Sequence, residues 1–538
     1  MKLKSEIPVE FLGRSLILGA SSRVFRGTTK PIGDNVMTKH SHPQRHCARW
    51  AKAAVLALTL LAWGKLVAQD GSVVSLGSRR ELFVDRYLID ATSGVELRLH
   101  QPMPKEIAMR YDKPWEGNTS IFFTIFRDGP IYRMYYDAAT YTPTTLPAHD
   151  VFIAYAESKD GTHWVRPELG LFAFNGSKKN NIVWASPKLD NWSCFKDTNP
   201  AATAEARYKG FHYVEKGLMA VKSSDGIHWS HLSDKPVLTD GAFDSLNLAF
   251  CDAERGHYRA YYRDFRNRLR DIKTATSQDF IHWTPGVWLE YPGAATEQLY
   301  TNNVIPYYRA PHLYLGFPTR YLDRGWSDAM RALPELAERE ARSKVSSRYG
   351  TALTDGLFMT SRDGTVFHRW AEAFIRPGLR YTDNWVYGDN YQNWGLVETK
   401  SDLPGGPDEI SIYVTEHYWR GAFSNLRRFT LRVDGFVSVN APGKGGEFTT
   451  RPLTFTGKEL EMNFSTSVAG SVRVEIQDAG GTPLPGYGLE DCPEIFGDHL
   501  ERVVSWKGGS DVSGLAGKPI RLRFVMKDAD LYSIRFRP

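Results

Sequence analysis

The hydrophobic pattern of the chain consists of short apolar or alternating runs separated by turn residues. Residues 120–126 and 131–136 are two such runs, and they flank the tetrapeptide Arg-Asp128-Gly-Pro. A third run covers residues 151–155. Runs of this length between turn residues are typical of β-strands. We therefore predict an all-β fold.

Comparable sets of runs recur along the chain. The set that contains 208–213 is the least regular, and the other sets repeat the plan of the first. The further runs lie at 246–250, 257–262, 272–275, 303–307, 313–317, 394–398 and 410–414.

A short turn built on an aspartate follows four of these sets. Asp-Gly between strand-like runs is a hairpin signal, because glycine tolerates positive φ and aspartate hydrogen-bonds its own turn. A looser fifth copy is Arg-Val-Asp434-Gly-Phe436, and successive copies are 54–84 residues apart. This spacing is about the length of one four-stranded sheet, so five copies predict a five-bladed β-propeller. The four close copies are Ser-Lys-Asp160-Gly-Thr-His-Trp164, Ser-Ser-Asp225-Gly-Ile-His-Trp229, Ser-Gln-Asp279-Phe-Ile-His-Trp283 and Ser-Arg-Asp363-Gly-Thr-Val-Phe367.

Strand direction separates two faces of the predicted propeller. The aspartate turns share one face, which we call the turn face, and we interpret their Asp and His residues as structural. The loop face receives the starts of the inner strands and the long loops 137–150, 263–271, 318–355 and 415–427. Functional residues concentrate on loops that a rigid scaffold holds, so we expect the site on the loop face.

The loop 318–355 is rich in helix-forming residues. Ser327 is a candidate helix cap, and Pro334 should break or kink the helix. We interpret the loop as a partly helical lid at the pocket rim; the alternative is a surface insertion without a role.

The pattern changes after Val439. Strand-like runs at 460–464, 471–476 and 520–525 are separated by glycine-rich turns, which predicts a β-sandwich. We expect the propeller to span residues 78–440 and the sandwich residues 441–538.

Composition is that of an ordinary globular protein, with 42% hydrophobic and 24% charged residues among 538. The aromatic share of 13% fits either blade packing or a sugar-binding cleft. A net charge of +6 with no basic block beyond the N-terminal segment gives no case for nucleic acid. Cys194, Cys251 and Cys492 form neither a disulfide framework nor a zinc pattern.

Residues 1–69 resemble an N-terminal extension with a secretory signal peptide. The apolar run 53–63 follows several basic residues and precedes Leu66-Val-Ala68, a small-residue cleavage site. Met37 would place the signal at the usual distance from the start of translation. We expect a secreted or periplasmic protein without stable membrane insertion after cleavage; the alternative is an uncleaved anchor.

Acidic residues stand at all five predicted blade openings, facing one central funnel. Taken singly, each is more typical of a turn or a solvated charge, but together they fit glycosidic bond cleavage, which needs a carboxylic acid and a second carboxylate. Other candidates for contact with substrate are Trp115, Asp137, Arg320 and His417. The acids at the openings are Glu116, Asp197, Asp244, Glu297 and Asp389.

Four segments resemble secreted bacterial proteins of the glycosyl hydrolase family 32 N-terminal domain-like type, and more widely the five-bladed-propeller glycoside hydrolases of families 32 and 43. The segments are Glu81-Leu-Phe-Val-Asp85-Arg-Tyr-Leu-Ile-Asp90, Phe195-Lys-Asp197-Thr-Asn-Pro200, Phe358-Met-Thr-Ser-Arg-Asp363-Gly and Ser505-Trp-Lys-Gly-Gly-Ser-Asp511.

The resemblance implies roles for three acids. Lys-Asp197-Thr-Asn-Pro resembles the Arg-Asp-Pro motif of the transition-state stabiliser. Glu116 stands where that clan has its nucleophile or base, within Trp-Glu-Gly-Asn instead of Trp-x-Asn-Asp-Pro-Asn-Gly. Asp244 stands where the clan has a glutamate as general acid, and Glu297 is a substitute for it. Asp85 could also reach the funnel.

These observations predict a secreted glycoside hydrolase that cleaves an oligo- or polysaccharide without cofactor or metal. The alternative is a non-catalytic carbohydrate-binding propeller. The sugar, the linkage, the stereochemistry and the oligomeric state stay open at this point.

Overall fold

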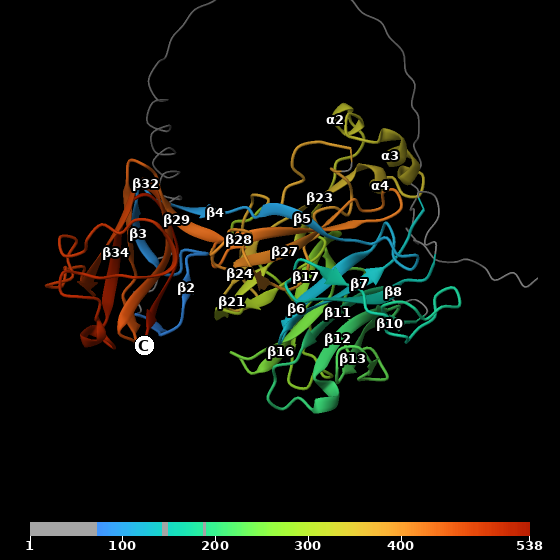
Figure 1. Cartoon of the computed structure of the whole chain (residues 1–538), viewed down its shortest axis with the longest axis horizontal. Coiled ribbons are helices and arrows are strands. Elements are labelled where there is room, and N and C mark those ends of the chain that lie inside the picture. The colour runs from blue at the N-terminus through green and yellow to red at the C-terminus, as the bar shows by residue number, and fades with distance from the viewer. Residues whose placement is uncertain (1–72, 143–148, 187–189, 383) are drawn as a thin grey trace, which may run out of the picture. The chain divides into compact units, whose positions relative to one another are not determined.

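The computed structural model describes residues 73–142, 149–186, 190–382 and 384–538 (Figure 1). The predicted leader in residues 1–69, with Met37, lies outside them. Across the described ranges, no helix combines the length and apolarity that a membrane crossing requires.

Five β-sheets follow one another along the chain, and each corresponds to one predicted blade. Blade 1 consists of β6 (Ile121–Asp128), β7 (Ile131–Ala138), β8 (Phe152–Ser158), β9 (Trp164–Val165) and β10 (Ile182–Ala185). Blade 2 consists of β11 (Asp190–Lys196), β12 (Tyr208–Val214), β13 (Gly217–Ser223) and β14 (Trp229–His231), with a 3₁₀ turn at Ala204–Ala206. Blade 3 consists of β15 (Leu248–Asp252), β16 (His257–Arg266), β17 (Leu269–Ser277) and β18 (Val287–Trp288).

The last two sheets keep the same antiparallel order. Blade 4 consists of β20 (Ile305–Tyr307), β21 (Ala310–Gly316), β24 (Met359–Ser361) and β25 (Phe367–Arg369). Blade 5 consists of β26 (Val397–Thr399), β27 (Glu409–Glu416), β28 (Asn425–Arg432) and β5 (Met103–Arg110).

The innermost segments of the blades meet in a closed ring. Strand β6 contacts β11. The Ser193 hydroxyl donates to the Asn247 carbonyl at 2.6 Å, which joins blades 2 and 3, and the Asn302 amide joins blades 3 and 4 through the Leu246 carbonyl at 3.2 Å. Blades 4 and 5 meet through the Asn303 amide, and the parallel bridge Thr124–Trp394 returns to blade 1. The fold is therefore the predicted five-bladed β-propeller.

Blade 5 is completed by a strand from the other end of the propeller sequence. β5 pairs antiparallel with β28, and Arg428 forms a two-point ion pair with Glu106 at 2.6 and 3.0 Å. The ring is thus closed by hydrogen bonds between its first and last strands.

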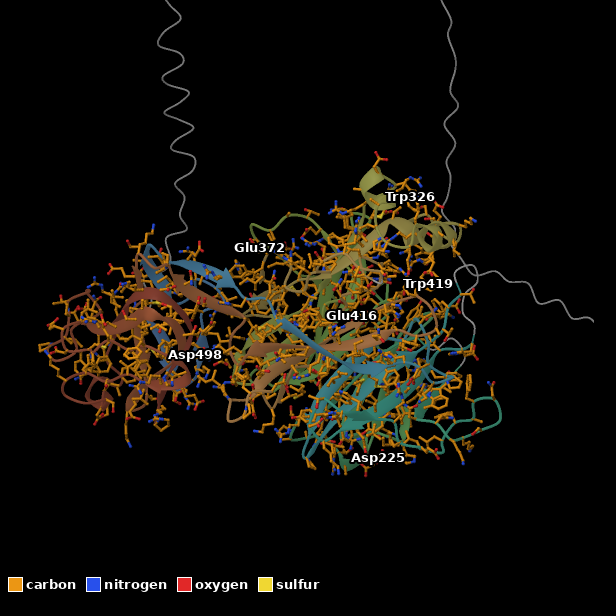
Figure 2. All side chains as sticks on the ribbon, turned by 45° about the horizontal axis from the view of Figure 1, so that its top comes forward. Asp225, Trp326, Glu372, Glu416, Trp419 and Asp498 are labelled. Carbon is orange, nitrogen blue, oxygen red and sulfur yellow. The ribbon has the colours of Figure 1, made fainter. Side chains whose placement is uncertain are left out.

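The four close aspartate turns have one geometry. In each, the aspartate Oδ1 accepts from the backbone N–H groups two and three residues on and from the preceding serine; for Asp225 these distances are 2.8, 2.8 and 3.0 Å. Gly161, Gly226 and Gly364 have φ near +80°, and Phe280 takes the same left-handed conformation in the third copy. In Figure 2, Asp225 lies at one end of the propeller and Trp326 at the opposite end.

The fifth turn serves a different purpose. Asp434 is completely buried and accepts a hydrogen bond from the Tyr307 hydroxyl at 2.7 Å. It also pairs with Arg309 at 3.1 Å and with Arg80 at 3.4 Å, and the Ser533 hydroxyl of the C-terminal sheet donates to it at 2.8 Å. This aspartate therefore ties the propeller to the strands on either side of it.

Blade 4 extends above the ring on the loop face. β22 (Thr319–Asp323), β23 (Ala352–Gly356) and β19 (Gln298–Leu299) form a separate three-stranded sheet, and β22 and β23 lie between β21 and β24 in the sequence. The connection contains α2 (Asp328–Arg331), α3 (Leu336–Ser343) and α4 (Arg348–Thr351). The Ser327 hydroxyl accepts from the Met330 N–H at 3.2 Å, and Pro334 lies between α2 and α3. The predicted cap and helix break are both confirmed.

The remaining strands form the C-terminal β-sandwich, whose apolar core contains Phe448, Phe464, Val474 and Phe524. Two long strands, β32 and β34, run through it, and their ladder is interrupted between Thr466 and Ser471. Its strands are β29 (Val437–Ala441), β30 (Gly446–Thr450), β31 (Leu453–Phe455), β32 (Glu459–Asp478), β33 (Asp498–Val503) and β34 (Ile520–Arg537), with a 3₁₀ turn at Ser513–Leu515.

Four strands from the start of the described chain also belong to this sheet system. They are β1 (Val74–Gly77), β2 (Glu81–Leu82), β3 (Ile89–Ser93) and β4 (Glu96–Leu99), which pair with β31, β34, β30 and β29 respectively. Residues 78–99, which we assigned to the propeller from the sequence, thus pair with C-terminal strands. A strand pattern shows which residues can pair but not which distant strand receives them.

Candidate functional site

Glu116 lies inside blade 1 and is buried. Its carboxylate accepts from Arg166 Nε at 2.7 Å, from the Tyr136 hydroxyl at 2.5 Å and from the Lys113 N–H at 3.1 Å. Burial raises the pKa of Glu116, although Arg166 opposes the shift. With both oxygens engaged, Glu116 is held as an internal ion-pair partner. Trp115 beside it donates from Nε1 to Asn181 at 2.7 Å.

Asp197 lies at the opposite end of blade 2 from the position we expected. It follows β11, the innermost strand, so it stands on the turn face. Its carboxylate binds the Lys209 ammonium and accepts from the Tyr258 hydroxyl at 2.7 Å. We expected Asp197 before the inner strand because 208–213 is the clearest strand-like run of blade 2. Asp190-Asn191 at the start of β11 is typical of a loop and gave no sign of an earlier strand.

Asp85 is also on the turn face. It pairs with Arg362 at 2.9 Å, and Arg362 belongs to the aspartate turn of blade 4. The expectation that Asp85 reaches the funnel is therefore not met.

Three other predicted acids lie on the loop face. The Asp244 side chain is 64% exposed, with Arg263 at 3.8 Å. Asp137 is buried and accepts from the backbone N–H groups of Asn191 and Trp192 at 3.0 and 3.4 Å. Asp389 is buried, and burial together with the charge of Glu416 raises its pKa well above the usual range. Asp244, Asp137 and Asp389 therefore have unlike environments.

Aromatic side chains fill the space above the inner strands on this face. The Tyr300 and Tyr391 rings are 5.4 Å apart, and the Phe122 and Tyr391 rings 6.3 Å apart. The buried members of this cluster are Ile121, Tyr300, Tyr321, Ala352, Tyr387, Tyr391 and Trp419. The centre of the loop face is thus packed with apolar residues, and the pockets described below lie away from this centre.

A large cleft lies between blades 3 and 4. It has a volume of about 930 Å³ and contains the predicted residues Glu297 and Arg320. Its walls come from Leu269 at the start of β17, from β19, β22 and β23, and from residues 371–378 after β25, including Glu372, labelled in Figure 2. A hollow of about 360 Å³ shares Leu269, Thr296 and Glu297 with it and extends the cleft along blade 3. Such volumes match ligand sites of about 300–1,000 Å³.

One arginine joins two carboxylates in this cleft. Arg320 Nε and Nη2 bind Asp355 at 2.9 and 2.5 Å, and Arg320 Nη1 binds Glu297 at 2.9 Å. Arg369 forms a second ion pair with Glu297. Arg320 and Asp355 are register partners in the β22–β23 ladder, which fixes their side chains on one side of the sheet.

The two carboxyl groups have opposite pKa shifts. Burial and the charge of Glu297 raise the pKa of Asp355, against the effect of Arg320. Burial would also raise the pKa of Glu297, but hydrogen bonds from Arg369 and Arg320 outweigh it and lower the pKa. Carboxyl groups with separated pKa values can act as acid and base in one reaction.

Asp355 is the functional candidate that sequence analysis missed. It appeared there only as the end of the loop 318–355. The signal that could have found it is the pairing of that end with Arg320, since both ends of a hairpin insertion meet in a ladder.

Trp385 and two further arginines complete the cleft. Trp385 is half-buried and offers an aromatic wall, with Nε1 donating to the Gly378 carbonyl at 3.0 Å. Arg324 and Arg376 line the cleft and are exposed. Nowhere in the described ranges do three or more His, Cys, Asp or Glu side chains gather as a metal site would require.

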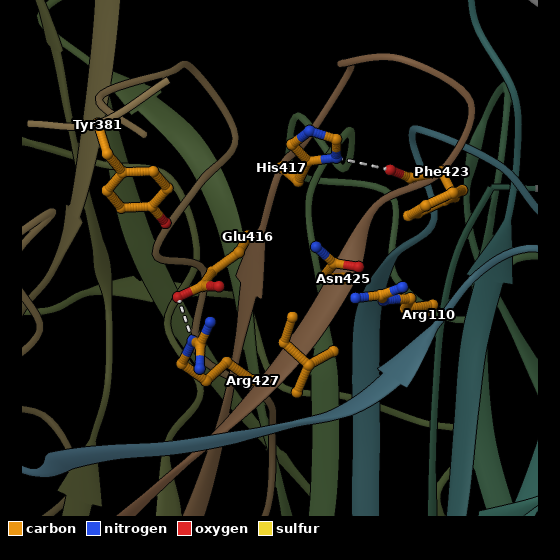
Figure 3. Close-up of a pocket in the computed structure, with 8 residues that line it drawn as sticks. Arg110, Tyr381, Glu416, His417, Phe423, Asn425 and Arg427 are labelled. Carbon is orange, nitrogen blue, oxygen red and sulfur yellow. Dashed lines mark hydrogen bonds and ion pairs between the residues drawn. The ribbon is translucent and has the colours of Figure 1, made fainter. Parts of the chain in front are cut away.

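His417 lies in a separate pocket of about 330 Å³ at blade 5 (Figure 3). The pocket is lined by Ile107, Arg110, Tyr381, Glu416, His417, Phe423, Asn425 and Arg427. The predicted site residues are thus distributed over the loop face, the blade interior and the turn face.

Comparison with known proteins adds a distant structural likeness. No protein-family model and no curated protein sequence matches the chain. A solved structure of an N-acetylgalactosamine deacetylase from F. plautii, in complex with blood group B trisaccharide, is 12% identical, with 64% of this chain and 96% of that chain covered and a TM-score of 0.38.

Two further solved structures are similar at the same level. A glycosyl hydrolase from Bacteroides ovatus is 14% identical over 66% of this chain and 93% of that chain, with a TM-score of 0.36. A fructofuranosidase variant from Schwanniomyces occidentalis, complexed with fructosylnystose, is 9% identical over 80% of this chain and 96% of that chain, with a TM-score of 0.35. Scores this low carry no argument about activity, so the case for function rests on the residues of the chain.

Proposed function

We propose that this protein is a secreted carbohydrate-active enzyme that hydrolyses glycosidic bonds in the cleft between blades 3 and 4. The observation that carries the proposal is the pair Asp355 and Glu297, joined by Arg320 in this cleft and shifted in pKa in opposite directions. Glycosidases divide their chemistry between two such carboxyl groups.

Each residue of the pair has a defined task in this proposal. Asp355, whose pKa is raised, keeps its proton to higher pH and donates it to the leaving glycosidic oxygen. Glu297, whose pKa is lowered, stays ionised and acts as base or nucleophile. Arg320 positions both carboxyl groups, and the indole of Trp385 provides a flat face for a sugar ring.

A glycan hydrolysis screen tests the proposal. Residues 70–538 are incubated with a broad glycan panel beside the variants Asp355→Asn and Glu297→Gln, and reducing ends are measured. We expect turnover of at least one glycan by the parent protein and its loss in both variants. Turnover that survives in both variants at the parent rate would refute the assignment of the cleft.

The pH profile gives a second test. Activity requires protonated Asp355 and ionised Glu297, so it should fall as pH rises through the Asp355 pKa and as pH falls through the Glu297 pKa. The expected curve of kcat/KM against pH is bell-shaped. If kcat/KM did not change with pH across the pKa values of Asp355 and Glu297, an acid–base pair of carboxyl groups would be excluded.

A non-catalytic glycan-binding function is the second candidate. It is supported by the ion pairs that already occupy Glu297 and Asp355, because such pairs also occur in purely structural networks. Saturable binding of a glycan without turnover, lost in an Arg324→Gln variant of the cleft wall, would favour this candidate.

Secretion is the part of the proposal that rests on the leader in residues 1–69. The test is N-terminal sequencing of the protein recovered from the periplasm or culture medium. A new N-terminus close to residue 69 is expected, and an intact leader in the cell fraction would refute secretion.

A further inference from the structure

The pocket at blade 5 has none of its lining residues in common with the cleft between blades 3 and 4. It lies where β27 ends, β28 begins and β5 ends, with Tyr381 contributed by the chain before β26 (Figure 3). All three strands are held in the antiparallel ladder of blade 5. The pocket walls therefore stand on rigid elements of the scaffold.

The pocket carries an uncompensated positive charge. Glu416 accepts from Arg427 Nε at 2.7 Å, so these two charges neutralise each other. The guanidinium of Arg110 has no carboxylate within ion-pair distance among the described residues, and it stands 5.9 Å from the centre of the Phe423 ring. An exposed guanidinium in a pocket is suited to two-point recognition of a carboxylate.

The other walls combine flat apolar surface with hydrogen-bonding groups. Phe423 contributes a ring, and Tyr381 a phenol that is half-exposed. The His417 Nδ1 lies 2.9 Å from the Phe423 carbonyl, which only accepts, so Nδ1 carries a proton. Asn425 adds an amide, which Figure 3 shows between His417 and Arg110.

The backbone at His417 is unusual for a residue other than glycine. Its φ is +63°, in the left-handed region, and that of Trp419 is +57°. Such conformations persist where the surrounding structure holds them, and they are concentrated at binding sites. Here the turn directs the imidazole toward the same hollow as Arg110 and Asn425.

We propose that this pocket binds one acidic sugar residue, with the sugar carboxylate on Arg110 and the sugar ring against Phe423 and Tyr381. Asn425 and Glu416 are placed to hydrogen-bond the ring hydroxyls. The volume of about 330 Å³ is at the lower end of the range of ligand pockets, which fits a single residue rather than an oligosaccharide. The site is a binding site only, and it goes beyond the proposed hydrolysis in the cleft.

The test is a calorimetric titration of residues 70–538 with glucuronate, with glucose and acetate as separate arms. Glucuronate is expected to bind with a Kd in the range of about 1 mM, typical of a single weak site. Glucose lacks the carboxylate and acetate lacks the ring, so each should bind at least about tenfold more weakly than glucuronate. Loss of a charge-assisted hydrogen bond in Arg110→Gln should weaken glucuronate about tenfold or more.

Two matched variants locate the binding. Arg127→Gln removes an exposed arginine on the turn face, and Asp355→Asn changes the cleft, so neither should alter the affinity for glucuronate. Phe423→Ala should weaken glucuronate binding independently of charge.

Every contrary result overturns the proposal in a defined way. Equal affinity for acetate reduces the site to an anion site, and equal affinity for glucose removes the role of Arg110. Loss of binding in Asp355→Asn with full binding in Arg110→Gln would place the acidic sugar in the cleft. Absence of heat with glucuronate at ten times the expected Kd refutes the site outright. Because no arm measures turnover, failure of the hydrolysis proposal leaves this test intact.

Discussion

Carboxyl groups on the two faces of the propeller differ in their surroundings and in their pKa shifts. On the turn face, Asp160, Asp225, Asp279 and Asp363 repeat one set of hydrogen bonds from blade to blade, and the pKa of each is lowered. On the loop face, Asp355 and Asp389 have raised pKa values and Glu297 has a lowered one, so these acids do not share one kind of surroundings. Repetition thus marks residues that build the ring, whereas the departures from repetition mark candidates for chemistry.

Among substitutions on the two faces, we expect the largest effect to be on catalytic activity. Asp355→Asn should lower kcat/KM on the glycan identified in the screen by about 100-fold or more, because a general acid contributes roughly 10²–10⁴-fold. Asp225→Asn on the turn face should leave kcat/KM unchanged. If the turn-face variant lost as much activity as the cleft variant, the two faces would not differ in the way we infer.

The fifth aspartate turn should be the most costly to remove for stability. Asp434→Ala removes one buried carboxylate from Arg80, which keeps Glu461 at 2.6 Å, and leaves Arg309 with only the half-exposed Glu501. It also deletes the hydrogen bond from Tyr307. Breaking a buried charge network typically costs about 3–5 kcal/mol. Urea unfolding should show this loss in the free energy of unfolding. If Asp434→Ala lowered the free energy of unfolding by less than Asp225→Ala does, Asp434 would not tie the propeller to its neighbouring strands.

Replacing Arg342 in α3 should make the protein more stable. Its guanidinium is fully buried above Trp419, and none of its nitrogens has a hydrogen-bond partner in the part of the chain that the structure describes. Burial lowers the pKa of this arginine. Arg342→Met should raise the free energy of unfolding by about 1 kcal/mol or more, since apolar side chains replace buried charges at no loss. Arg331→Met in α2, which is exposed and paired with Glu340, is the control and should be neutral; a loss of stability in Arg342→Met would contradict the inference.

The smallest effect is expected at a single turn of the repeat. Asp225 is half-exposed, and hydrogen bonds from His228 and Ile227 outweigh burial to lower its pKa. Asp225→Ala should cost about 1 kcal/mol, the contribution of one or two hydrogen bonds.

The pH dependence of this cost has a defined sign. A lowered folded-state pKa gives stability that is complete above the unfolded pKa of about 3.9 and is lost as pH falls through the folded value. The difference in stability between Asp225→Ala and the parent protein should therefore be full near neutral pH and shrink in acid. A difference that grew on acidification would contradict the assignment.

The regular part of the fold was predictable from local signals, and the site was not. The aspartate turns and the runs around them indicate five blades, because turn chemistry and alternation are properties of neighbouring residues. Asp197 was misplaced because β11 starts with residues typical of loops, which hid the innermost strand of blade 2. Asp355 was missed because it becomes a candidate only through its ion pair with Arg320, which is 35 residues away in the sequence. Only the β22–β23 ladder brings the two side chains together.

The closure of the ring by β5 sets the order in which the molecule can be assembled. Glu106 on β5 and Arg428 on β28 are 322 residues apart in sequence, so the ribosome makes the first strand long before its partner. Until then β5 has an open hydrogen-bonding edge, which is a template for pairing with other chains. A chain that ends before residue 425 lacks the partner of that edge and should aggregate, whereas loss of the C-terminal strands alone should not leave β5 unpaired. Synthesis of β28, rather than the stability of any single blade, therefore controls when the edge of β5 is paired and protected from association with other chains.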